Sequence, residues 1–95
     1  MPVRLSDFEI SSIRDAVSAL DPKARVHLFG SRVDDAKRGG DIDLLILSDL
    51  LSNGDRSAIR RRLWELIGEQ KIDIVIAKDA SDPFVRIALK EGAPL

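Results

Sequence analysis

The chain of 95 residues contains no cysteine. Disulfides and thiolate metal sites are therefore excluded, and the composition is compatible with a reducing compartment. No apolar run approaches the ~18 residues of a membrane-spanning helix, and the opening segment MPVRLSDFEI lacks the apolar core of a signal peptide. We expect a cytoplasmic protein.

A strong charge of either sign is also absent. Fifteen basic and sixteen acidic residues leave a net charge of −1, which argues against a protein that grips long nucleic acid. A single nucleotide could still be bound locally. The length suits one small domain, residues 1–95, with no room for a second catalytic or substrate-binding domain.

Hydrophobic periodicity predicts helices and strands in alternation. SDFE, from Ser6, has the spacing of a capping box, and Asp82 followed by Pro83 is typical of another helix start. We expect helices over residues 7–20, 55–70 and 82–92, strands over 25–29, 41–47 and 71–77, and a short helical turn over 31–37. This order predicts an α+β fold in two layers, with helices on one face of a small mixed sheet. The helix between the last two strands favours a parallel pair, and the shorter link before them an antiparallel pair.

Three carboxylates stand out against apolar strands. Asp41 and Asp43 open the strand DIDLLIL on one face, with Cα atoms ~6.6 Å apart, and Asp73 lies between isoleucines in KIDIVIA. If the strands are neighbours, the three carboxylates converge, and like charges that close require a cation. Oxygen ligands select Mg²⁺ or Mn²⁺, and two such ions would suit in-line phosphoryl or nucleotidyl transfer. Asp41 alone would be read as a strand-entry residue after the Gly-Gly turn, and Asp43 or Asp73 alone could equally be structural; the constellation favours function.

A glycine-serine turn follows the first strand. Gly30 and Ser31 would offer backbone N–H groups and a hydroxyl to phosphate oxygens, although such dipeptides often only mark turns. Arg32 could reach a triphosphate or form a structural ion pair. Carboxylates on one side and this turn on the other predict a bound nucleoside triphosphate.

The stretch LFGSRVDDAKRGGDIDLLIL, followed by KIDIVIA, resembles the nucleotidyltransferase superfamily of DNA polymerase β. Gly-Ser, a spacer, Asp-x-Asp and a later carboxylate form its signature, and the whole chain looks like the single-domain minimal nucleotidyltransferases. The resemblance implies that Gly30 and Ser31 hold the outer phosphates of ATP, and that Asp41 and Asp43 bind two Mg²⁺ ions. Asp73 would complete one metal site and help to activate the attacking hydroxyl. Gly40 stands where the family often has serine.

The same resemblance implies a partner. Minimal nucleotidyltransferases are commonly antitoxins of HEPN-domain ribonuclease toxins, and some transfer AMP to a toxin tyrosine. Transfer to a small molecule such as an aminoglycoside, and masking of a toxin by binding alone, are the alternatives. The acceptor, the preferred nucleotide and the oligomeric state stay open.

Two further features have no assigned role. His27 alternates within the first strand and is expected to be a hydrogen-bonded core or rim residue. The last helix has apolar residues around much of its circumference, from Phe84 to Leu89. It either inserts into the core or presents a docking surface.

Overall fold

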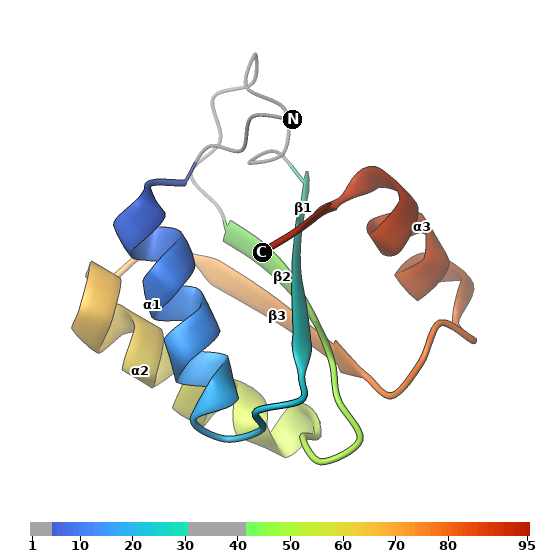
Figure 1. The fold of residues 1–95 in the computed structure, drawn as a ribbon, viewed down its shortest axis with the longest axis horizontal. Coiled ribbons are helices and arrows are strands. Elements are labelled where there is room, and N and C mark those ends of the chain that lie inside the picture. Colours follow the sequence, from blue (N-terminus) through green and yellow to red (C-terminus); the bar gives the residue numbers. More distant parts are fainter. Residues whose placement is uncertain (1–4, 31–41) are drawn as a thin grey trace.

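The computed structural model describes residues 5–30 and 42–95 of the chain. Its helices are α1 (Asp7–Ser18), α2 (Arg56–Ile67) and α3 (Pro83–Glu91), with a 3-10 turn, η2, at Asn53–Asp55. Its strands are β1 (Arg25–Phe29), β2 (Ile42–Leu47), β3 (Ile72–Ala77) and β4 (Ala93–Pro94) (Figure 1). The helical turn expected over residues 31–37 lies outside the described residues. None of the helices in the described ranges has the length and apolar character needed to cross a membrane.

The strands form one mixed sheet in the order β3-β2-β1-β4. The β1–β2 pair is antiparallel and the β2–β3 pair is parallel, as the connection lengths predict. The short edge strand β4, antiparallel to β1, was not expected. It ends in Pro94, and proline is tolerated on an edge strand because the missing N–H can face away from the sheet.

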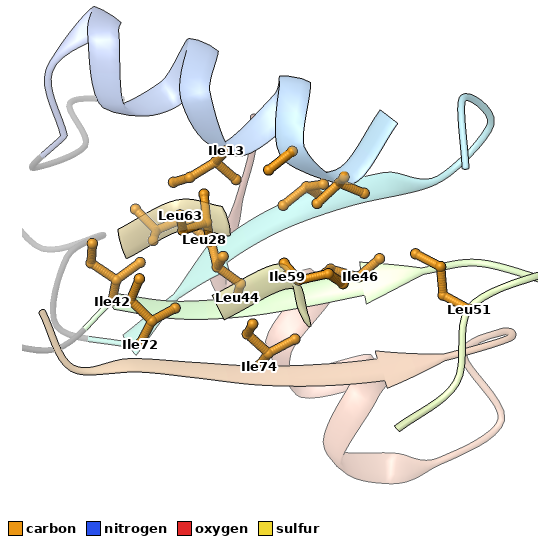
Figure 2. Packing of buried hydrophobic residues seen from close by; sticks show 13 residues of the cluster. Ile13, Leu28, Ile42, Leu44, Ile46, Leu51, Ile59, Leu63, Ile72 and Ile74 are labelled. Atoms are coloured by element: carbon orange, nitrogen blue, oxygen red, sulfur yellow. The ribbon is translucent and has the colours of Figure 1, made fainter. Parts of the chain in front are cut away.

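The main core lies between the sheet and the helices α1 and α2. Alternate strand residues point to this side, among them Leu28, Leu44 and Ile74, and each is almost completely buried. Figure 2 shows these side chains beneath Ile13 of α1, with Ile59 and Leu63 contributed by α2. The inner faces of the two helices are therefore buried, but the apolar repeat of the first helix does not extend to Leu20, which is 47% exposed.

The third helix lies on the opposite face of the sheet (Figure 1). Val85 and Ala88 of α3 are buried against Leu45, whose side chain points away from the main core. The α+β class and the mixed sheet are confirmed, but the expectation of helices on one face is wrong for α3. Leu45 explains the difference, since a buried leucine on the second face needs a cover.

The helix starts follow the predicted capping chemistry. The Ser6 hydroxyl accepts a hydrogen bond from the Glu9 N–H at 3.1 Å, and the Glu9 carboxylate accepts one from the Ser6 N–H at 3.0 Å. Asp82 Oδ1 accepts from the Phe84 N–H at 2.7 Å, with Pro83 in the first turn of α3. Asp55, the residue before α2, makes no capping hydrogen bond to that helix: its side chain accepts from the Ser52 N–H instead.

Candidate active site

Two of the predicted carboxylates lie side by side on neighbouring strands. The parallel register of β2 and β3 pairs Asp43 directly with Asp73, so their side chains stand on one face of the sheet. Neighbouring strands are about 4.8 Å apart. Asp43 is half-buried and Asp73 is exposed. The face is the one that α3 partly covers, opposite the main core. Approach from solvent is therefore open at Asp73.

Gly30 places the end of β1 against Asp43. Its φ of +80° is in the left-handed region that favours glycine. A Cβ atom built on Gly30 would contact Asp43 Oδ2 and would lie 3.1 Å from Asp43 Cγ. Phe29, the residue before it, is the direct register partner of Asp43 in the β1–β2 pair. The backbone of the turn therefore runs directly beside a carboxylate.

The other predicted site residues, Ser31, Arg32 and Asp41, lie outside the described residues. Among residues 5–30 and 42–95, no group of three or more histidine, cysteine, aspartate or glutamate side chains is arranged to hold a metal ion. Only two members of the proposed triad belong to those ranges. The roles of all six predicted site residues stay predictions, and the structure brings together Gly30, Asp43 and Asp73.

Comparison with known protein families gives one result. The family model described as the nucleotidyltransferase domain matches residues 10–95. The chain belongs to this family. A comparison with curated proteins found no match. Family membership supports nucleotidyl transfer as the general chemistry of the chain, while the minimal type and an antitoxin role stay predictions.

The donor set of this nucleotidyltransferase domain fits a hard cation. Asp43 and Asp73 offer carboxylate oxygens at adjacent strand positions, and the chain has no cysteine that would favour a soft metal. Asp41, two residues before Asp43, would supply the third carboxylate. These are the residues that would hold Mg²⁺ or Mn²⁺.

Two hydrogen bonds at the start of β3 fix the position of the strand that carries Asp73. The Ile42 N–H donates to the Lys71 carbonyl at 2.9 Å, which aligns the first residues of β2 and β3. Arg60 Nε donates to the Ile72 carbonyl at 2.9 Å and so attaches α2 to the residue before Asp73. The sequence did not predict this contact, because Arg60 lies in the run RRR, whose side chains are expected to be solvated. Only the sheet's position relative to α2 could show the contact.

His27 differs from its expected hydrogen-bonded state. It lies on the same face of the sheet as Asp43, and its Nδ1 atom is buried with no hydrogen-bond partner within the described part of the chain. Burial, and then the positive charge of Arg25, lower the pKa of His27 below its ordinary value of 6.5. The neutral imidazole is therefore favoured, and His27 adds no fixed positive charge to this face.

A groove of about 720 Å³ lies elsewhere, between α1 and the edge formed by β1 and β4. Arg14, Arg25, Asp7 and Asp15 line it, together with apolar residues such as Leu95. Its lining includes neither Gly30 nor the two carboxylates. The charges of the two basic and two acidic side chains cancel, so the groove favours neither an anionic nor a cationic ligand.

Proposed function

We propose that this nucleotidyltransferase domain transfers AMP from ATP to a tyrosine hydroxyl of a partner HEPN ribonuclease toxin and acts as its antitoxin in the cytoplasm. The observation that carries the transferase part is the pairing of Asp43 with Asp73, with the Gly30 backbone directly against Asp43. A carboxylate pair next to a glycine turn suits a metal-bound triphosphate better than a purely structural strand end, where paired like charges are unfavourable.

Each predicted residue has a role in this proposal. Gly30 and Ser31 hold the outer phosphates, and Arg32 lies next to them in sequence to neutralise negative charge. Asp41, Asp43 and Asp73 hold two Mg²⁺ ions. When bound, the ions neutralise charge that develops on the phosphate oxygens and lower the pKa of the attacking hydroxyl.

The transfer is a single displacement at phosphorus. The tyrosine oxygen forms a bond to the α-phosphorus, and the bond from that phosphorus to the oxygen bridging to the β-phosphate breaks. Pyrophosphate leaves with the electron pair. The hydroxyl proton passes to a carboxylate of the site, for which exposed Asp73 is best placed.

Two features support a protein acceptor. The net charge of −1 disfavours a long nucleic acid as acceptor. The exposure of Asp73 allows a hydroxyl carried by another macromolecule to approach the site. The resemblance to minimal nucleotidyltransferases adds the HEPN toxin as the specific partner.

Intact-mass spectrometry of the toxin tests the proposal. Incubation of this chain with ATP, Mg²⁺ and a cognate HEPN ribonuclease should add one AMP to a toxin tyrosine and stop cleavage of RNA. The double variant Asp41→Asn, Asp43→Asn should do neither, while Asp49→Asn, an exposed aspartate after β2, should act like the wild type. Neutralisation by the double variant, with no mass added by the wild type, would replace the enzyme with a binding antitoxin.

A further inference from the structure

An aromatic pair adjoins the carboxylate face. Phe29 is the register partner of Asp43, and its ring meets the ring of Phe84 edge to face, with centroids 5.7 Å apart and planes at 81°. Phe84 is in the first turn of α3. Phe29 therefore lies between Asp43, its partner in the sheet register, and Phe84, whose ring it contacts.

The outer side of α3 is more apolar than its attachment to the sheet requires. Val85 and Ala88 anchor the helix, with exposed fractions of 3% and 4%. Phe84 and Ile87, three residues apart, have exposed fractions of 48% and 56%. These two side chains form an apolar surface that the fold leaves in contact with water.

We infer that Phe84, supported by Phe29, is a stacking platform for the purine base of the nucleoside triphosphate, with Ile87 at its margin. This inference rests on the proposed function, because the triphosphate must bind at Gly30, Asp43 and Asp73. Those residues recognise phosphates and metal ions, and they leave the apolar faces of the base without a contact. An exposed aromatic ring next to the site supplies one.

The chemistry of the surface favours a base over an apolar protein segment. Any apolar side chain could pack against a leucine-rich segment, whereas this surface has an aromatic ring held in position by a second ring. The ring pair is continuous with Asp43 through the β1–β2 register. Stacking on such a surface favours large aromatic bases and discriminates little between adenine and guanine.

Binding measurements on the chain without any partner test the inference. Calorimetry would compare MgATP with magnesium tripolyphosphate, which has the phosphates but no base. Phe84→Leu keeps an apolar contact with Phe29 but removes the aromatic face, and it should weaken MgATP about tenfold while leaving tripolyphosphate unchanged. Phe84→Trp should retain MgATP binding.

Phe8→Ala is the matched control, since Phe8 is an exposed phenylalanine, 63% accessible, on helix α1 at the opposite face of the sheet. It should bind both ligands like the wild type. In NMR spectra, the adenine protons should shift upfield on binding to the wild type and less on binding to Phe84→Leu, because a ring stacked on the base shields them.

The outcomes separate this inference from the proposed function. Equal MgATP binding by wild type and Phe84→Leu would overturn the platform, even if AMP transfer to the toxin were lost, which would make α3 an acceptor-docking surface. Equal losses for both ligands would also overturn it. A wild-type chain that binds neither ligand would contradict the phosphate and metal site itself, and with it both proposals.

Discussion

Gly30 combines a backbone conformation and a contact that each disfavour a side chain. Its φ is +80°, and a Cβ atom would press on the Asp43 carboxylate. Gly68 at the end of α2 has a similar φ of +89°, but a Cβ atom there would meet nothing within 4 Å. A substitution at Gly68 therefore tests backbone strain alone, whereas one at Gly30 tests backbone strain together with contact with Asp43.

We predict that Gly68→Ala lowers the free energy of unfolding by about 1–3 kcal/mol, because Gly68 has φ +89° and ψ 165°, a backbone region almost restricted to glycine, and that it leaves MgATP binding unchanged. Gly30→Ala should destabilise more and also weaken MgATP binding, since it displaces Asp43. Urea unfolding and calorimetric titration measure both effects. Wild-type affinity in Gly30→Ala would separate the turn from the nucleotide site.

His27 predicts a pH dependence of stability. Burial lowers its pKa in the folded state below 6.5, so the unfolded chain takes up a proton first as the pH falls. The contribution of His27 to stability is complete above pH 6.5 and is lost progressively below it. Urea unfolding at pH 7.5 and 5.5 should show a smaller difference for His27→Gln than for the wild type. An equal difference would contradict the burial effect.

At the scale of the elements, loops at the end of the sheet opposite the carboxylates are joined by a buried hydrogen bond. Ser48 Oγ donates to Asp21 Oδ2 at 2.6 Å and accepts from the Leu50 and Leu51 N–H groups at 3.0 and 2.9 Å. Asp21 and Ser48 are 3% and 4% exposed. The contact ties the α1–β1 loop to the segment that follows β2.

We predict that Ser48→Ala lowers the free energy of unfolding by about 1–3 kcal/mol, because it leaves buried polar groups without partners. Ser18→Ala is the control: its hydroxyl makes an exposed, 3.4 Å bond to the Asp15 carbonyl, and its removal should cost less than about 0.5 kcal/mol. Thermal or urea unfolding distinguishes the two variants. Equal stabilities would show that the buried bond adds nothing.

The elements also show which features the sequence could predict. Ser6 with Glu9, and Asp82 with Pro83, place two helix starts correctly because capping depends on residues a few positions apart. The face chosen by α3 could not be predicted, since its apolar residues surround much of the helix and only Leu45 decides which side is buried. The strand β4 has two residues, too few for a periodic pattern.

At the scale of the whole molecule, the sheet register carries the candidate site. Strand alternation and a parallel β2–β3 pair were enough to predict that Asp43 and Asp73 share a face. The contact of Gly30 with Asp43 and the bond from Arg60 to the Ile72 carbonyl depend on three-dimensional packing. No local pattern encodes either contact, so the sequence alone could not predict them.

The central claim is that Asp43 and Asp73 hold divalent metal together with a nucleoside triphosphate. Electron paramagnetic resonance of Mn²⁺, titrated into the chain with ATP present, tests it most directly, with Asp49→Asn as the matched control. The wild type and Asp49→Asn should bind Mn²⁺ beyond the amount held by ATP alone. Asp43→Asn and Asp73→Asn should each lose most of this binding, by about tenfold or more, because each removes a ligand charge. Unchanged Mn²⁺ binding in both variants would contradict the account.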